Sequence, residues 1–437
     1  MLLLKGARCI DPRVGLDAIT DILIRDGSIA AVGADLPVGD DGLGTDRPLI
    51  RDLSGRVILP GLMDMHVHLR EPGQEYKEDI ASAARAAAQG GFVAVLAMPN
   101  TQPVTDSASR VAFVLDKARY VGVTRVHVAG ALSRDLAGES LAEIGDMYKA
   151  GAVAFTDDGR GLQDCGLMRL AMDYVHQFAC PVLSHCELES LVGSGVVHEG
   201  IVSTRLGLAG WPAAGEEIQI ARDIALAELS GCALHIQHIT TAVGLKLVRE
   251  AKERGLPVSC EVTAHHLFLN ENDLNATYDT NLKMNPPLRT TADNQALQEA
   301  LIEGLIDVVA SDHAPHAAHE KALEFERAPF GCTGLETTLS LLLTELVGLE
   351  KMSYQRLVEC LAHAPRRILG LEEVGIVAGS PADLTVIDPG VRWQVEAENW
   401  QSKSANNAFI GQQLQGRASD VYVRGIPSMI EGTVCDV

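Results

Sequence analysis

The feature that most constrains the fold is an alternation of short apolar runs with alanine-rich helical stretches through the middle of the chain. Eight such runs occur, at residues 58–69, 92–98, 125–131, 152–156, 181–185, 233–239, 257–262 and 306–311. Helical patterns such as YKEDIASAARAAAQGG and AAGEEIQIARDIALAELSG lie between most of them. Because repeated strand–helix units build a parallel sheet, eight of them predict a closed (β/α)8 barrel of the TIM type, with an open doubly wound sheet as the alternative.

The two ends of the chain have a different, β-type pattern. DILIRDGSIAAVG predicts a hairpin that turns at Asp26–Gly27, and GSPADLTVIDP and DVYVRGIPSMIEGTV predict strands with turns. A loop rich in glycine, aspartate and proline is expected at 33–48. We therefore expect an α/β protein in which residues 58–369 form the barrel, while residues 1–57 and 370–437 together form one small β domain.

Composition excludes several classes of function. The net charge of −22 argues against binding to nucleic acids or to anionic membrane surfaces. The nine cysteines include no C-x-x-C pair, which indicates thiols in a reducing compartment. The start, MLLLKG, is too short for a signal peptide, and no apolar run approaches membrane-spanning length, so we expect a cytoplasmic protein.

Polar residues gather where the predicted strands end. In LPGLMDMHVHLREPG, strand alternation places Asp64, His66, His68 and Arg70 on one side. A His-x-His pair alone often has only a structural role. Later strands, however, add Asp157, Asp158, His185, His238 and Asp312 at their carboxyl ends. In a closed barrel these ends meet at one rim, which is the catalytic face of such folds.

Four histidines and two carboxylates form a nitrogen and oxygen ligand set. Zn²⁺ suits this set best, with Mn²⁺, Co²⁺ and Fe²⁺ as alternatives. Six ligands are too many for one tetrahedral ion but suit two ions that share a bridging ligand. Such a site activates water and polarises a carbonyl, so the sequence predicts hydrolytic chemistry. The spacing does not decide whether Asp157 or Asp158 is the bridge.

At this point eight motifs, taken in order, resemble those of a known family. They are PGLMDMHVHLREPG, AMPNTQP, FTDDG, SHCE, HIQHITT, KMNPPLR, ASDHAPH and PFGCTGLET. Together they resemble the dihydroorotases of bacterial class I, within the amidohydrolase superfamily, over about residues 50–375 and the flanking β segments. TAHHLFL, AHAPRRILGL and Gln237 depart from the usual pattern without removing a proposed ligand. The resemblance implies reversible, metal-dependent cyclisation of N-carbamoyl-L-aspartate to L-dihydroorotate in pyrimidine (UMP) biosynthesis.

The resemblance also implies roles for the rim residues. It implies His66, His68 and Asp312 as ligands of one metal, His185 and His238 as ligands of a second, and Asp158 as the carboxylate between them. One or two Zn²⁺ ions per chain are expected. Related hydantoinases and allantoinases usually have a carboxylated lysine as the bridge, whereas Lys149 lies before this strand. Asp312 is the expected catalytic group, which accepts a proton from the attacking water and passes it to the leaving nitrogen.

A second implied set binds the substrate. It consists of His68, Arg70, Asn100, Asn285, His316, Phe330 and Gly331. The guanidinium of Arg70 suits a carboxylate. Asn100 and Asn285 beside prolines have an ordinary alternative as turn residues. Residues 314–333 are expected to form a loop over the site.

The expected partners are a small-molecule substrate, a second copy of the chain in a homodimer, and aspartate transcarbamoylase. Two alternatives to the activity remain open. One is another cyclic amidase, such as a hydantoinase or an allantoinase, against which Arg70, Asn100 and the missing bridge lysine argue. The other is a catalytically silent dihydroorotase-like subunit that scaffolds aspartate transcarbamoylase. The complete set of ligands argues against that alternative.

Overall fold

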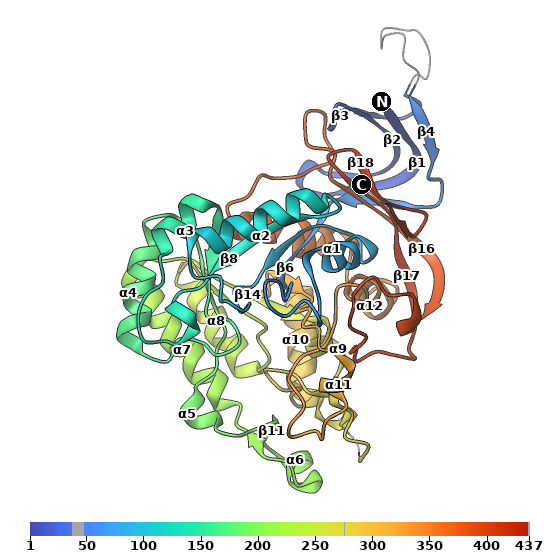
Figure 1. Ribbon diagram of the computed structural model, residues 1–437. Helices are drawn as coiled ribbons and strands as arrows, with labels where there is room; N and C mark the ends of the chain where they lie inside the picture. Colours follow the sequence, from blue (N-terminus) through green and yellow to red (C-terminus); the bar gives the residue numbers. More distant parts are fainter. Residues whose placement is uncertain (37–47, 275, 436–437) are drawn as a thin grey trace.

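The barrel occupies the centre of the protein (Figure 1). The computed structural model describes residues 1–36, 48–274 and 276–435. Within these ranges, eight parallel strands follow one another in the order β15-β14-β13-β10-β9-β8-β7-β6. They are β6 (Leu62–Val67), β7 (Phe92–Ala97), β8 (Arg125–Gly130), β9 (Ala152–Phe155), β10 (Val182–Ser184), β13 (Leu234–Ile236), β14 (Val258–Thr263) and β15 (Val308–Ala310). Each overlaps one of the apolar runs, so the predicted barrel is confirmed.

The first and last strands meet at their carboxyl ends. Val67 pairs with His313 in a parallel bridge, and the backbone N–H of His68 donates to the carbonyl of His313 at 2.9 Å. The buried carboxylate of Asp64 accepts the backbone N–H of Ser311 at 3.1 Å. These contacts close the sheet and bring the residues that follow β15 beside those that follow β6.

Helices lie between and after the barrel strands, and the long ones pack around the barrel (Figure 1). They are α1 (Ile80–Gln89), α2 (Ala108–Val121), α3 (Ile144–Ala150), α4 (Cys165–His176), α5 (Glu189–Val192), α6 (Ile201–Leu206), α7 (Ala214–Ser230), α8 (Ala242–Glu253), α9 (Ala264–Phe268), α10 (Thr291–Glu303), α11 (Ala318–Lys321), α12 (Thr338–Leu342), α13 (Tyr354–Val358) and α14 (Ala364–Ile368). Local sequence sets several starts: Asp79 and Ser82 form a capping box at α1, as do Thr290 and Asp293 at α10. No helix among the described residues is long and apolar enough to span a membrane.

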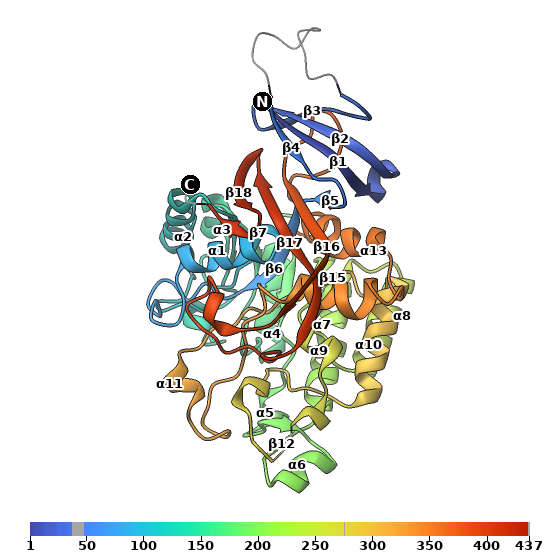
Figure 2. The same cartoon turned by 90° about the vertical axis from the view of Figure 1, so that its right-hand side faces the viewer.

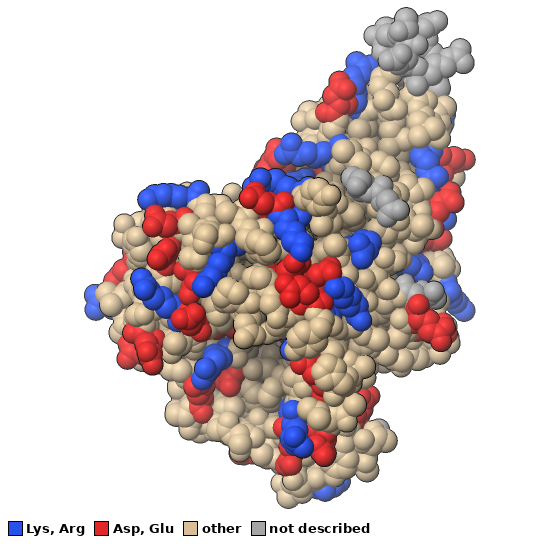
Figure 3. Space-filling view, viewed as in Figure 1, with Lys and Arg blue, Asp and Glu red and all other residues tan. Residues whose placement is uncertain are grey.

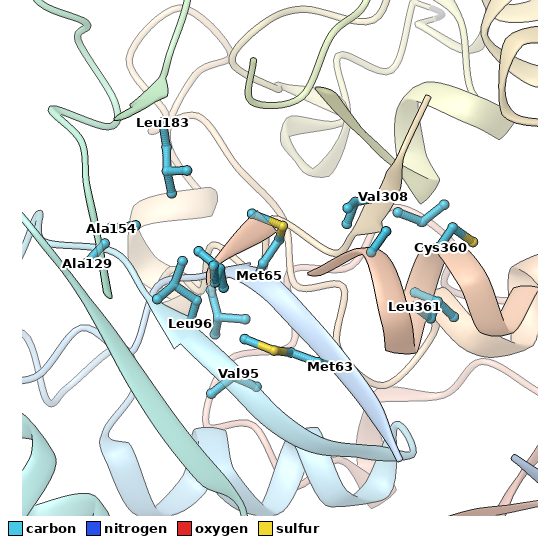
Figure 4. Close-up of a cluster of buried hydrophobic side chains, with 14 of the residues drawn as sticks. Met63, Met65, Val95, Leu96, Ala129, Ala154, Leu183, Val308, Cys360 and Leu361 are labelled. Carbon is cyan, nitrogen blue, oxygen red and sulfur yellow. The ribbon is translucent and has the colours of Figure 1, made fainter. Parts of the chain in front are cut away.

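Aliphatic and sulfur-containing side chains dominate the buried hydrophobic core of the barrel region. Met63, Met65, Leu96, Leu183 and Val308 gather in one buried cluster (Figure 4). Since only 4% of the residues are aromatic, this core rests on many small contacts rather than on a few large rings. It gives the rim residues a rigid support.

The two ends of the chain share a second sheet at one end of the molecule (Figures 1 and 2). Its strands in the described residues are β1 (Leu2–Asp11), β2 (Leu16–Arg25), β3 (Ser28–Gly33), β4 (Leu49–Asp52), β5 (Val57–Pro60), β16 (Leu384–Gln394), β17 (Gln413–Val423), β18 (Ile426–Ile430) and β19 (Thr433–Val434). β16 pairs with β5, so both ends build one sheet as predicted. Asp26 and Gly27 have positive φ angles of 51° and 78°, which suits the expected hairpin turn.

Most of the loop expected at 33–48 lies outside the described residues. The domain boundaries at 57/58 and 369/370 stay a prediction.

Figure 2 shows β16 and β17 running from this sheet down beside the barrel. Their connection, residues 395–412, contains the buried residues Asn406, Asn407 and Phe409.

Candidate metal centre and active site

A cavity of about 210 Å³ lies where the carboxyl ends of the barrel strands meet. It is lined by His68, Arg70, Asn100, Asp158, Gly159, His185, His238, Asn285, Asp312, Ala314, His316, Phe330 and Gly331. Apart from His66, every residue of the predicted metal-ligand and substrate-binding sets therefore lines this one cavity. The His66 side chain is completely buried and contacts Asp158.

The ends of the barrel strands position these side chains. His66 lies within β6, and His68 follows its last residue; Asp158, His185, His238 and Asp312 lie one to three residues beyond β9, β10, β13 and β15. Strand alternation predicts that Arg70 lies on the side of the histidines, but the strand ends before Arg70. β6 ends at Val67, and Arg70 has a left-handed backbone with φ 58°. Its side chain reaches the cavity because the chain turns there.

Asp158 stands between two groups of metal-ligand type. Among the described residues, one group is His66, His68 and Asp158, and the other is Asp158, His185 and His238. Asp158 Oδ1 lies 3.3 Å from His66 Nε2 and 3.5 Å from His185 Nδ1. The facing nitrogens of His185 and His238 are 2.9 Å apart. This geometry suits a carboxylate shared by two cations.

Asp312 joins the first group. Its Oδ1 lies 3.1 Å from His68 Nε2 and 3.5 Å from His66 Nε2. Burial raises the pKa of Asp312, but His66 and His68 outweigh that effect and hold it below its usual value. The group is therefore an ionised carboxylate near neutral pH.

The two neighbouring aspartates face in different directions. Asp157 Oδ1 accepts the backbone N–H groups of Leu132 and Ser133 at 2.8 and 2.9 Å, and its other oxygen accepts the Ser133 hydroxyl. Asp157 thus supports the chain after β8. Asp158 faces the histidines.

The outer nitrogens of three histidines have their own partners. His66 Nδ1 lies 2.6 Å from Glu261 Oε1, His68 Nδ1 lies 2.8 Å from Asn100 Oδ1, and His185 Nε2 lies 3.0 Å from Glu187 Oε2. Such partners orient metal-binding imidazoles and fix their tautomers. Asn100 thus contacts a ligand-type residue as well as the cavity.

Sequence reasoning missed the roles of Glu261 and Glu187. Glu261 lies in β14, within the apolar stretch VSCEVT, and is completely buried. A lone carboxylate in an apolar strand was the available signal, because it needs a partner in the interior. Glu187 belongs to the SHCE motif, and its Oε2 also accepts from Asn285 Nδ2 at 3.0 Å.

The donor set fits divalent cations. In the described structure, His66 Nε2 and Asp158 Oδ1 are buried without a hydrogen-bond partner. Burial raises the pKa of Asp158, but His66, His185 and His238 bring it well below its usual value. Burial lowers the pKa of His185, but Asp158 and Glu187 raise it to about 9. The site therefore attracts positive charge, which protons or metal ions can supply.

Arg70 adds a positive charge to the cavity, which can bind an anion, whereas the His/Asp groups can bind cations. It is 8% exposed, and within residues 1–36, 48–274 and 276–435 it forms no ion pair. Its Nε donates to the carbonyl of Pro315 at 3.2 Å, and Nη2 lies 3.4 Å from His316 Nε2. His316 Nε2 in turn lies 2.8 Å from the carbonyl oxygen of Phe330. A buried guanidinium that faces a cavity without a counter-ion is suited to bind an anion.

Comparison with known proteins identifies the family. A family model described as dihydro-orotase-like matches residues 55–243. The chain is 45% identical over 426 residues to a dihydroorotase of Anaeromyxobacter dehalogenans, with 97% of each chain covered. It is 46% identical over 424 residues to a dihydroorotase of Citrifermentans bemidjiense, covering 97% of this chain and 98% of that relative. The chain belongs to the dihydroorotase family.

Solved structures of cyclic amidases share the fold. The chain is similar to an L-hydantoinase (dihydropyrimidinase) from Arthrobacter aurescens, with a TM-score of 0.86, 25% identity and coverage of 99% of this chain and 97% of that one. It is also similar to a D-hydantoinase (dihydropyrimidinase) from Thermus sp., with a TM-score of 0.84, 25% identity and coverage of 100% and 97%. Dihydroorotase relatives are thus closer in sequence than these hydantoinases, and the barrel architecture is common to both.

Proposed function

We propose that this member of the dihydroorotase family catalyses the reversible conversion of N-carbamoyl-L-aspartate to L-dihydroorotate in pyrimidine biosynthesis. The observation that carries the proposal is that one cavity contains both the two His/Asp groups and the guanidinium of Arg70, which forms no ion pair among the described residues. Dihydroorotate carries one carboxylate beside a ring of two amides. A site for it needs an anion-binding group next to the hydrolytic centre, and this cavity offers both.

Different substrate-binding residues would bind different groups of the ligand. Arg70 would hold the carboxylate through two parallel N–H donors. Asn285 Oδ1 is buried without a hydrogen-bond partner among the described residues, so it is available to a ring N–H. His316, Phe330 and Gly331 line the same wall. These contacts would orient the ring so that one amide carbonyl faces the histidines.

The ligand set would be His66, His68, Asp158 and Asp312 for one ion, and Asp158, His185 and His238 for the other. Bound there, Zn²⁺ would polarise the amide carbonyl and make a water molecule acidic at neutral pH. We propose one or two Zn²⁺ ions per chain. Glu261, Asn100 and Glu187 would keep the imidazoles oriented.

Asp312 moves the proton in this scheme. As a carboxylate within 3.1 Å of His68, it can accept a proton from the attacking water on one side of the ring. It then gives that proton to the ring nitrogen as the amide bond breaks. In the biosynthetic direction the same carboxylate takes the proton from the ureido nitrogen as the ring closes.

One experiment tests the activity and its nearest alternative together. The purified chain is assayed with L-dihydroorotate, hydantoin, dihydrouracil and allantoin, and metal is quantified in the same sample. We expect turnover of dihydroorotate with little of the other three, since only dihydroorotate offers a carboxylate to Arg70. Preference for hydantoin or dihydrouracil would favour the activity in the names of the structural relatives.

The silent-subunit alternative predicts a different result in the same assay. A scaffold would have no turnover and no metal, although it would keep the fold. The complete His/Asp set and its orienting partners favour an active enzyme instead.

We further propose that the protein is a cytoplasmic homodimer that can associate with aspartate transcarbamoylase. Light scattering of the chain alone, and of the chain mixed with that enzyme, would test both associations.

A further inference from the structure

We infer that Asn406 is a positioning residue for substrate binding, because it ties together the two ends of the segment 314–331. The inference rests on the proposed function, since this segment carries His316, Phe330 and Gly331. Asn406 itself lies about 75 to 92 positions away in the chain, on the connection between β16 and β17. It does not line the cavity.

Both the oxygen and the nitrogen of the Asn406 side-chain amide form hydrogen bonds. Oδ1 accepts the backbone N–H of His316 at 3.0 Å. Nδ2 donates to the carbonyl of Ala314 and to the carbonyl of Gly331, both at 3.2 Å. The side chain is 5% exposed. One buried amide therefore links the start and the end of the segment, next to the backbone hydrogen bond from the N–H of Ala314 to the carbonyl of Cys332 at 2.8 Å.

The separation between these two ends is tight. Gly331 has φ 113°, and a Cβ atom placed on it would lie 2.6 Å from the Cβ of Ala314. A side chain at Gly331 would therefore force the two ends apart. Between these ends, His316 Nε2 meets the carbonyl of Phe330 at 2.8 Å, and this pair borders Arg70. The position of the wall that faces the ligand thus depends on how the two ends are held.

The chemistry of the contact requires an amide. Aspartate has nearly the same shape and could still accept the N–H of His316, but it has no hydrogens for the carbonyls of Ala314 and Gly331. Its negative charge would repel both oxygens. Asn406→Asp should therefore loosen the segment without removing volume from the core.

The neighbouring Asn407 provides a matched control. It is 2% exposed, its Nδ2 donates to the carbonyl of Thr333 at 2.7 Å and to Thr337 Oγ1 at 3.2 Å, and its Oδ1 accepts the N–H of Phe409 at 2.8 Å. Asn407→Asp thus removes the same kind of donor from a buried carbonyl, but outside the segment 314–331. It measures the general cost of a buried aspartate on this connection.

The experiment compares KM and kcat for dihydroorotate in the metal-loaded wild type, Asn406→Asp and Asn407→Asp, with metal content and thermal midpoint recorded for each. Losing buried hydrogen bonds that place binding groups should raise KM by ~10-fold in Asn406→Asp while kcat changes less. Asn407→Asp should keep the wild-type KM, even if its thermal midpoint falls. Hydrogen exchange should be faster within 314–331 in Asn406→Asp than in Asn407→Asp.

Three results would overturn the inference. They are a wild-type KM in Asn406→Asp, an equal rise of KM in both variants, and unchanged exchange within 314–331. If Asn406→Asp does not fold, Asn406→Ala removes the same amide without adding a charge, and the same comparison with Asn407→Ala applies. A wild-type chain without dihydroorotase activity would instead refute the proposed function, and this role would fall with it.

Discussion

Asp158 Oδ1 lies 3.3 Å from His66 Nε2, and within the described residues both atoms are buried without a hydrogen-bond partner. The two atoms lie at ion-pair distance but make no hydrogen bond, and a buried polar atom without a hydrogen bond costs about 1–3 kcal/mol. The fold accepts this cost at the point where Asp158 faces both groups of histidines. The two atoms are therefore prepared for an added partner, which fits a shared metal ligand.

The first prediction compares the two neighbouring aspartates. Asp158→Asn should reduce bound metal and lower kcat by ~100-fold or more, because an amide is a weaker bridge between cations than a carboxylate. Asp157→Asn should affect mainly stability, since Asp157 holds the backbone of Leu132 and Ser133. Metal content and kcat of both variants give the answer. Equal loss of metal in the two variants would contradict the distinct place of Asp158.

The barrel was predictable because its information is local. Each strand is an apolar run such as FVAVLA at 92–97, and a helix pattern separates it from the next. The rim residues followed, since a closed parallel sheet brings all carboxyl ends of its strands together. Sequence distance does not matter once the order of strands is known, so His66 and Asp312 could be placed side by side.

The remaining details depend on backbone angles and on contacts between distant segments. Two adjacent aspartates after β9 are equivalent in a periodic pattern, and only the turn decides which one faces the histidines. Arg70 enters the cavity through a positive φ that alternation does not foresee. Glu261 contacts His66, 195 positions away, and Asn406 contacts His316, 90 positions away. No local sequence pattern predicts such pairs.

A second prediction concerns Arg70. Arg70→Lys should raise the KM for dihydroorotate by ~10-fold or more, because an ammonium cannot make the paired, planar contacts of a guanidinium. Arg160→Lys is a suitable control, since Arg160 is exposed and pairs with Glu189. Steady-state kinetics of the two variants and wild type test this. An unchanged KM in Arg70→Lys would show that Arg70 does not hold the carboxylate.

A third prediction separates proton transfer from metal binding at Asp312. Asp312→Asn should keep part of the metal, because its amide oxygen can still approach the cation. It cannot accept a proton at neutral pH, so kcat should fall by about 10²–10⁴-fold. Metal content and kcat are measured in the same preparation. Near-normal kcat with metal bound would remove Asp312 from proton transfer.

A fourth prediction concerns removal of the metal. Chelation should abolish turnover while the circular dichroism spectrum stays nearly unchanged, because the large apolar core does not depend on the ions. The thermal midpoint should fall, since a ligand that binds only the native state stabilises it. Restoring Zn²⁺ should restore activity. Loss of secondary structure on chelation would instead make the metal structural.

The last prediction uses a carboxyl group away from the cavity. Burial raises the pKa of Glu336 to about 7, although the backbone N–H groups of Gln401 and Ser402 donate to it at 3.1 Å. A raised pKa means that the folded protein prefers the protonated carboxyl. The contribution of Glu336 to stability is therefore complete below its ordinary pKa of 4.5 and is lost as the pH rises through about 7.

Glu336→Gln removes this titration while keeping an oxygen that can accept both N–H groups. Relative to wild type, the free energy of unfolding of this variant should increase by on the order of 1–2 kcal/mol between pH 5 and pH 8. Urea unfolding of metal-depleted wild type and variant at both pH values measures the difference, and metal depletion keeps pH-dependent metal binding out of the comparison. A difference that stays constant across this range, or one that shifts in favour of the wild type at pH 8, would show that Glu336 is ionised in the folded protein without penalty.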